Sequence, residues 1–430
     1  MPALQDPVAV IGGGLAGLAA AARLAKAGHP VQLFEREAGL GGSWRAVEQP
    51  GVGLVDRAPA VLTFPAPWRD LFRKSGRPLE AELARSGHAL VSAADTTYRF
   101  EDGSELSLPT ERGAQYQALT AAYGESAARR WRDLLDQLDG VWQVLRPLGL
   151  ERELGRHRLP RSVRRQLQAR RSLAWLAAQL DEPHLAALVR SVAYRQGSVP
   201  EQTPAWVAVQ VAVSRTFGHW NVVATEPARH AGDTGRSSVL AEALAGRLAL
   251  RRVAVHLSTP VRALHLEDGR VAGVRTDDGV HPAAAVIATT DPWHLVEDLL
   301  PPAAGRELRR RTGRLRPAGA PTVTHSRLAE PCAGLSETVE LTAGGVPVVT
   351  YRRPGAVGTV VSRHDFGRLL PTPGAGVAWL GFRRWFDQPP ITTEVAGLYT
   401  AGPSSPAGNT PSAVILSGAL ASYACQRGGG

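Results

Sequence analysis

A glycine-rich turn near the start of the chain limits the fold more than any other feature. The apolar run Val8–Ile11 is followed by Gly12-Gly13-Gly14-Leu15-Ala16-Gly17, and an alanine-rich stretch then continues to Gly28. A second apolar run, Val31–Phe34, leads directly to Glu35. A GxGxxG pattern between strand and helix, with a second strand close behind, is typical of a dinucleotide-binding unit. The sequence therefore predicts an α/β fold that contains a Rossmann-type domain.

Each position of this turn has a physical reason. A phosphate must approach backbone N–H groups closely, and a Cβ on Gly12 or Gly14 would block that approach. Gly17 lets the helix pack against the strand, and the helix N-terminus, which includes Ala16, attracts the negative charge of a pyrophosphate. Glu35 stands at the end of the second strand, where a carboxylate accepts hydrogen bonds from a ribose hydroxyl.

The residues after the second strand distinguish between the common dinucleotides. Arg36 follows at once, and Gly41-Gly42-Ser43 supplies a second glycine pair that can approach the cofactor. The sequence has no second GxGxxG, so a separate nicotinamide-binding domain is not expected. We predict one nucleotide site, which binds FAD and uses Arg36, Gly42 and Ser43.

Composition narrows the function classes further. The chain has 430 residues, 44% of them hydrophobic and 20% charged, as in a globular protein of two domains. Only Lys26 and Lys74 are lysines among 49 basic residues, so the net charge of +10 comes mainly from arginine.

Cys332 and Cys425 lie far apart and no histidines have metal-ligand spacing, so we expect neither a disulfide framework nor a metal. Without a recognisable signal peptide or membrane span, we expect a cytoplasmic protein.

Further patterns follow in order along the chain. They are the segment 56–63, the turn at 98–103, a stretch from Ser172 through Asp181-Glu182-Pro183 to Pro204, and the closing elements 397–402 and 411–418. Together with residues 8–43, these resemble the phytoene desaturase-like (carotenoid desaturase) branch of the FAD-dependent amine oxidase superfamily. The resemblance implies a place in carotenoid biosynthesis and additional cofactor-binding residues: Pro59, Ala60, Val261, Gly402, Thr410, Pro411 and Ser412.

The resemblance also implies an interleaved architecture. We expect an FAD-binding domain from residues 1–75, 225–295 and 386–430, and an α+β substrate-binding domain from 76–224 and 296–385. The family's usual arginine after the second glycine pair is replaced by Ser43, and its Pro-Arg-Gly-Gly-Met segment is present only as Gly232-Asp233-Thr234-Gly235. The local patterns predict mainly helices over 65–218 with a hairpin at 97–108, a strand over 280–288, and an antiparallel sheet from runs at 322–328, 338–341, 346–351 and 359–362.

Two functions remain open. The preferred one is a desaturase or dehydrogenase that moves hydride from a lipophilic, isoprenoid-like substrate to flavin N5, which requires an apolar tunnel more than acid–base side chains. Catalytic side chains therefore stay unknown. Pro411 suits the first position of a helix with Thr410 as its N-cap, and the resemblance points this N-terminus at the flavin's pyrimidine edge.

The alternative is a flavin oxidase of an amine, an amino acid or a small natural-product intermediate. Amine oxidases commonly use a late lysine near flavin N5, whereas both lysines here are early. They also usually place an aromatic residue where this chain has Pro411-Ser412. Weaker candidates for substrate contact are the pairs His219-Trp220 and His364-Asp365 and the late cluster Trp379, Phe382, Arg383, Arg384 and Trp385.

The segment 152–171 is dense in arginine and is predicted to be helical. Leucines and a valine share the stretch, which makes it basic and partly amphipathic. Such a segment suits docking on an anionic membrane surface, and a solvated charged face is an equal alternative. Nucleic acid binding is not expected, because no recognised module or aromatic platform is present.

Overall fold

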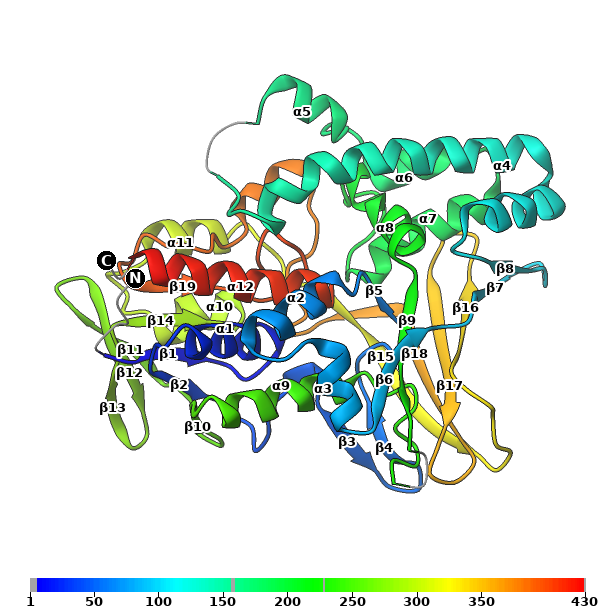
Figure 1. Cartoon of the computed structure of the whole chain (residues 1–430). Helices are drawn as coiled ribbons and strands as arrows, with labels where there is room; N and C mark the ends of the chain where they lie inside the picture. Colours follow the sequence, from blue (N-terminus) through cyan, green and yellow to red (C-terminus); the bar gives the residue numbers. More distant parts are fainter. Residues whose placement is uncertain (1–5, 156–158, 227–228, 429–430) are drawn as a thin grey trace.

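The computed structural model describes residues 6–155, 159–226 and 229–428. A five-stranded parallel sheet has the order β10-β2-β1-β14-β19 (Figure 1). Each strand is short, and β1 and β14 are completely buried, as expected for a parallel sheet covered on both faces. The strands are β1 (Val8–Ile11), β2 (Val31–Phe34), β10 (Ala254–His256), β14 (Ala285–Ala288) and β19 (Leu398–Thr400).

Helices from the two ends of the chain pack together against this sheet. The helices α1 (Leu15–Lys26) and α12 (Pro411–Gly428) run side by side, coloured blue and red in Figure 1. A Cβ on Gly418 would lie 2.3 Å from the carbonyl oxygen of Ala16, so the missing side chain permits the close contact. Two more helices, α9 (Ser238–Leu250) and α2 (Ala66–Ser75), also pack on α1.

A six-stranded sheet forms the second layer, in the order β15-β18-β17-β16-β7-β8. Its hairpin of β7 and β8 was predicted. As predicted, the four later strands pair antiparallel, and the whole sheet is mixed because β7 adds to β16 in parallel. A hairpin from the early chain thus extends a sheet formed mainly by later residues. The strands are β7 (Thr96–Phe100), β8 (Glu105–Leu108), β15 (Gly319–Leu328), β16 (Ser336–Leu341), β17 (Pro347–Pro354) and β18 (Thr359–Pro371).

A helical layer packs against this sheet and contributes most of the largest hydrophobic cluster. Its long helix α4 is interrupted at Gly124, which has a φ of 82°. The helices are α4 (Arg112–Leu145), η2 (Arg146–Leu150), α5 (Arg161–Gln166), α6 (Leu173–Ala178), α7 (Pro183–Arg195), η3 (Ala205–Ala208) and α8 (Val209–Phe217).

Smaller elements connect these layers. A two-stranded sheet pairs β3 with β4, and a three-stranded sheet has the order β11-β12-β13. Among the described residues, no helix is both long and apolar enough to cross a bilayer. The remaining elements are η1 (Gly42–Trp44), β3 (Ala46–Gln49), β4 (Gly53–Asp56), α3 (Leu79–Arg85), β11 (Ala263–Glu267), β12 (Arg270–Thr276), β13 (Gly279–Pro282), α10 (Pro292–His294), η4 (Leu295–Leu299), α11 (Arg306–Thr312) and η5 (Phe382–Asp387).

Three sequence predictions need correction. The region 65–218 is mainly helical as predicted, but it also contains an unpredicted strand, β6 (His88–Ser92), which pairs with β9 (His219–Ala224), and β9 in turn pairs with β5 (Leu62–Thr63). The run at 280–288 is two strands, β13 and β14, which belong to different sheets.

The arginine-dense segment is the third correction. Among the described residues of this segment only α5 is helical, and its one apolar residue, Val163, is only partly buried, so little apolar surface is available to stabilise a longer helix. Arg156 and Arg158 lie outside the described residues. The predicted boundaries between the FAD-binding and substrate-binding domains stay a prediction.

Candidate active site

The carboxyl ends of three parallel strands meet around the glycine turn. Gly12 follows β1, Thr289 follows β14 and Gly402 follows β19. Gly12 has a φ of 102°, and a Cβ on it would lie 2.6 Å from Thr289 Oγ1, which donates to the Ile11 carbonyl at 2.8 Å. A Cβ on Gly17 would lie 1.9 Å from the Gly12 carbonyl oxygen. The backbone therefore excludes a side chain at Gly12, where β1 ends, and at Gly17, in the first turn of α1.

Gly14, in contrast, faces open space. A Cβ on this residue would meet no atom within 4 Å. Gly14 caps α1 without a side chain, and the first turn of α1 contains no acidic residue, so the helix itself does not neutralise its N-terminal N–H groups. Gly42 approaches Gly14 closely, since its Cβ position is 3.1 Å from the Gly14 Cα, and Ser43 beside it is exposed. This cradle of backbone N–H groups fits a pyrophosphate.

Glu35 is buried and held beside the turn. Its Oε2 accepts a hydrogen bond from the Gly13 N–H at 2.6 Å, and its Oε1 accepts one from the Glu37 N–H at 2.8 Å. The segment that contains Val261 runs alongside, because the Thr259 N–H donates to the Glu35 carbonyl at 2.9 Å. The Val261 side chain is buried in a hydrophobic cluster, which leaves its backbone as the part that can face a cofactor.

Arg36 lies apart from these residues. Its side chain is 70% exposed, and its ion pair is with the neighbouring Glu37, 3.5 Å away. No contact among the described residues ties Arg36 to the glycine turn. Pro59 and Ala60 are both predicted to contact the cofactor, but their environments differ. Pro59 is exposed to solvent, whereas Ala60 is buried in the large hydrophobic cluster.

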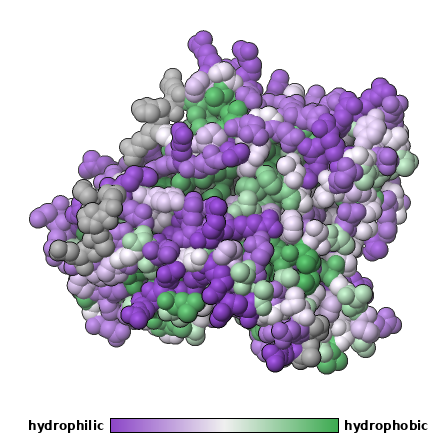
Figure 2. All heavy atoms as spheres, in the orientation of Figure 1, coloured by the Kyte–Doolittle hydropathy of each residue, from purple (hydrophilic) through white to green (hydrophobic). Residues whose placement is uncertain are grey.

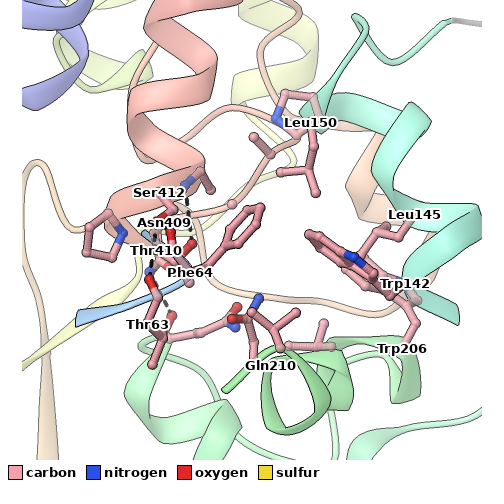
Figure 3. Close-up of a pocket in the computed structure, with 18 of the residues that line it drawn as sticks. Thr63, Phe64, Trp142, Leu145, Leu150, Trp206, Gln210, Asn409, Thr410 and Ser412 are labelled. Carbon is pink, nitrogen blue, oxygen red and sulfur yellow. Dashed lines mark hydrogen bonds between the residues drawn. The ribbon is translucent and has the colours of Figure 1, made fainter. Parts of the chain in front are cut away.

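The start of α12 is tied to the segment that follows β5. As predicted, the helix begins at Pro411, and Thr410 Oγ1 accepts a hydrogen bond from the Ala413 N–H at 3.4 Å. Ser412 Oγ donates to the Phe64 carbonyl at 2.8 Å (Figure 3). Phe64 has a φ of 54°, an uncommon left-handed conformation for an aromatic residue. The hydrogen bond fixes this strained residue against the helix N-terminus.

A pocket lies at this end of α12 (Figure 3). Most of its walls are aromatic or aliphatic, and the polar side chains among them are uncharged amides and hydroxyls. No ionisable side chain is found among the described residues that line it. The lining residues include Phe64, Trp142, Leu145, Leu148, Leu150, Trp206, Val207, Val213, Trp379 and Ala413, together with Thr63, Gln196, Gln210, Asn409, Thr410, Pro411 and Ser412.

The late aromatic cluster identified in the sequence is split between the pocket wall and the buried core. Trp379 lines the pocket, and its Nε1 donates to Gln196 Oε1 at 2.9 Å. Trp385 is fully buried, and its Nε1 donates to the Pro406 carbonyl at 2.9 Å. The sequence analysis missed Trp142 and Trp206. They are far apart in the chain and show no local pattern that distinguishes a pocket wall from ordinary core.

Comparison with known proteins identifies the family of this chain. The family described as flavin containing amine oxidoreductase matches residues 15–384. Hydroxyneurosporene desaturase from Rhodobacter capsulatus is 30% identical over 310 residues, which cover 70% of this chain and 59% of that protein. A zeta-carotene-forming phytoene desaturase from Myxococcus xanthus is 28% identical over 313 residues, covering 69% of this chain and 56% of that protein. The chain thus spans less than two thirds of the length of these curated relatives.

A solved structure of a putrescine oxidase double mutant shares the fold. It has a TM-score of 0.67 and 17% sequence identity, and the match covers 99% of this chain and 100% of that one. The predicted resemblance to carotenoid desaturases, the fold class and the FAD cofactor are confirmed by these comparisons. The chain is an FAD-dependent oxidoreductase, and it belongs to the family of flavin containing amine oxidoreductases.

Proposed function

We propose that the chain is a desaturase or dehydrogenase that removes hydride from a lipophilic, isoprenoid-like substrate. The observation that carries the proposal is the pocket at the start of α12, whose lining is aromatic, aliphatic or uncharged. Such a lining suits a hydrocarbon chain and offers no counter-ion to a protonated amine. Similarity to relatives named as desaturases of hydroxyneurosporene and phytoene supports the same class of substrate here.

Bound FAD supplies the hydride acceptor. In the proposed reaction a substrate C–H bond breaks and its electron pair leaves as hydride, while a proton leaves the neighbouring carbon and a C=C bond forms. The pocket walls position the substrate chain for this step. The N-terminus of α12 favours the negative charge that arrives with the hydride. Because the described lining contains no ionisable base, we infer that the proton passes to solvent.

Within the cofactor site, we propose that Gly12, Gly14, Ala16 and Gly17 hold the pyrophosphate and that Glu35 binds the ribose. The second glycine pair, Gly42 and Ser43, would complete the phosphate cradle. The remaining predicted contacts are Arg36, from its place after the second strand, and, from the resemblance, Pro59, Ala60, Val261, Gly402, Thr410, Pro411 and Ser412.

Anaerobic flavin bleaching against a panel of polyenes and amines tests the reaction. Only a true reductant bleaches the flavin, so we expect bleaching by at least one polyene and by no amine. Bleaching by an amine or amino acid alone would establish the alternative, a flavin oxidase of a small nitrogen-containing substrate.

We also propose that the arginine-dense segment docks on an anionic membrane surface. Exposed arginines lie on and after α5, and the segment directly follows η2, which forms part of the pocket wall. Figure 2 shows hydrophobic side chains gathered on and beneath this segment, among hydrophilic ones. A basic surface with apolar side chains beside a pocket mouth would serve a substrate that resides in a bilayer.

Liposome flotation with and without anionic lipid tests this docking. We expect recovery with anionic liposomes, and loss of that recovery when Arg161, Arg164 and Arg165 are all replaced by glutamine. The matched control replaces three exposed arginines of α4, Arg112, Arg129 and Arg132, in the same way. Equal recovery in the soluble fraction under all conditions would contradict the proposal.

A further inference from the structure

Two histidines and an aspartate converge beside the strand pair β6 and β9, outside the pocket lining. His88 is the first residue of β6, and His230 and Asp233 belong to the segment between β9 and α9 (Figure 1). Their ligand atoms all lie within 4.8 Å of one another. His88 Nε2 is 3.1 Å and His230 Nδ1 is 3.4 Å from the same atom, Asp233 Oδ2. Sequence spacing predicts no metal, but His88 stands 145 residues before Asp233, so only the fold brings these ligands together.

The tautomer of His88 leaves a lone pair facing Asp233. The Ser86 hydroxyl donates its hydrogen to the Leu83 carbonyl at 2.9 Å, so its oxygen can only accept from His88 Nδ1, which is 3.2 Å away. Nδ1 therefore carries the proton of the neutral imidazole, and Nε2 presents a lone pair to the carboxylate. Two acceptors at this distance repel each other unless a cation lies between them. Metal-binding histidines normally have this arrangement, with the second ring N–H donated to a neighbouring oxygen.

The backbone around the cluster is held in place by contacts of its own. The Gly235 N–H donates to the Val222 carbonyl at 2.7 Å, which ties the segment to β9. Gly87 has a φ of 73°, and a Cβ on it would lie 2.6 Å from His230 Nε2, so the missing side chain leaves space for the imidazole. A set of ligands that is already in place loses little conformational entropy when it binds an ion.

The charges around Asp233 are compatible with a bound cation. Arg236 forms its ion pair with Oδ1 of Asp233, which leaves Oδ2 for the two histidines. The same guanidinium is paired with Glu242 and lies 3.6 Å from a carboxylate oxygen of Asp56. With the nearby Arg353 included, three carboxylates face two guanidinium groups. A cation beside Asp233 offsets the remaining negative charge.

The ligand set and its spacing suit zinc. Two imidazole nitrogens and one carboxylate oxygen are typical zinc ligands, whereas magnesium and calcium prefer oxygen alone. Bonds of about 2.0–2.2 Å in a tetrahedron place the ligand atoms about 3.3–3.6 Å apart. The distances of 3.1 and 3.4 Å to Asp233 Oδ2 are close to this spacing. The His230 side chain is 30% exposed, so a water molecule can reach the fourth position.

We propose that His88, His230 and Asp233 bind one zinc ion, which holds residues 229–237 against β6. This segment leads directly into α9, whose first residue, Ser238, donates its N–H to the buried Asp56 at 2.9 Å. The helix α9 in turn packs on α1. The ion therefore stabilises the connection between the strand pair and the cofactor-binding core. The inference does not depend on the proposed function, because none of the three ligands lines the pocket.

Zinc binding to the intact, FAD-loaded protein without an affinity tag tests the inference. After removal of metals with a chelator, equilibrium dialysis against micromolar Zn²⁺ measures the bound ion. We expect one ion per chain, because no other group of three His, Cys, Asp or Glu side chains in the described part of the chain meets the same distance. Excess Mg²⁺ should leave zinc binding unchanged. Absence of bound zinc, or its displacement by Mg²⁺, would overturn the proposal.

A single variant identifies the ligands. His230→Gln disturbs the fold least, because His230 is the most exposed of the three. Loss of a residue that only orients a metal ligand already weakens metal binding about 10–100-fold, so we expect loss of a ligand to weaken zinc binding at least about a hundredfold. His294→Gln is the matched control, because His294 pairs with a single carboxylate, Asp298, at 2.6 Å, and it should bind zinc as the parent protein does. Unchanged zinc affinity in His230→Gln would refute the site.

Thermal unfolding distinguishes a metal site from a cluster that is only hydrogen-bonded. An ion that binds the folded protein alone raises its stability, so zinc should raise the Tm of the parent protein and of His294→Gln but not that of His230→Gln. A parent Tm that does not respond to zinc, or an equal rise in all three proteins, would contradict the proposal.

Discussion

The nucleotide end and the substrate end of this protein are formed by different kinds of chemical groups. Around Gly12, Gly14 and Gly17 the site is formed by the backbone, and side chains are excluded or absent. Around Phe64 and Trp206 the site is formed by side chains held in place by helix packing. A backbone site depends on a few dihedral angles and tolerates little change, whereas a side-chain site can change its ligand through one substitution.

Among the variants that test this difference, Gly17→Ala is expected to have the largest effect. The added Cβ would lie 1.9 Å from the Gly12 carbonyl oxygen, so the turn must move. We expect a loss of more than about 4 kcal/mol of stability together with loss of bound FAD, measured by denaturant unfolding and by flavin content. Gly246→Ala is the control, because its Cβ would meet open space within α9, and it should stabilise by about 0.5–1 kcal/mol. Normal FAD content in Gly17→Ala would contradict the statement that the backbone site tolerates little change.

Trp206→Ala tests the substrate end. Trp206 is 6% exposed and lies between two other tryptophans, with ring centroids 5.0 Å from Trp379 and 4.9 Å from Trp385. Its truncation should cost about 3–5 kcal/mol through the cavity that it leaves. Flavin content should stay near that of the parent protein while the rate of flavin reduction by substrate falls. Trp206→Phe, which keeps an aromatic wall, should recover most of both losses. Loss of FAD in the folded alanine variant would contradict the separation of the two ends.

The pH dependence of the unfolding free energy tests whether His364, in the six-stranded sheet, is buried as a neutral imidazole. Burial is the main cause that lowers the pKa of His364 from 6.5 to about 4, with His325 and Arg195 contributing. As pH falls, the unfolded chain takes up this proton near pH 6.5 and the folded protein only near pH 4. Stability is therefore lost across that window, by about 3 kcal/mol from this residue.

Denaturant unfolding of His364→Asn across the same window should show a correspondingly weaker pH dependence. Identical pH profiles for the parent and His364→Asn would show that His364 does not have this buried, neutral character.

The smallest effect is expected for Glu35→Gln. The glutamine keeps the size of the side chain but loses the charge that strengthens its hydrogen bonds, so FAD binding should weaken by about 1.5–3 kcal/mol. Apparent Kd values for FAD, measured by fluorescence titration of the apoprotein, give the result. Glu37→Gln, two residues away and exposed, should bind FAD as before. An unchanged Kd in Glu35→Gln would remove Glu35 from the proposed ribose contacts.

The nucleotide end could be predicted from sequence because its signals are local. The glycine turn, the two flanking strands and the capped start of α12 are each specified within a few residues, and the structure has them where they were expected. Arg36 illustrates the limit, since its exposed side chain is paired with Glu37 rather than with the turn.

The substrate end could not be predicted in the same way. Phe64, Trp142 and Trp206 come from three distant segments, and each taken alone resembles an ordinary core aromatic. The strand β9 was missed because its stability comes from pairing with β5 and β6, both more than 100 residues earlier in the sequence. Hydrophobic pattern predicts which elements form, but non-local pairing decides which faces meet.

The position of β19 and α12 beside β1 and α1 has a consequence for synthesis. The strand β1 leaves the ribosome about 390 residues before β19, which at 5–20 residues per second is roughly 20 to 80 s, and β2 follows shortly after β1. During that interval the face of α1 that later contacts α12 has no partner. Completion of the cofactor-binding core must therefore wait until residues 398–428 have been made, and a chaperone that shields the uncovered face of α1 would have to do so through that interval.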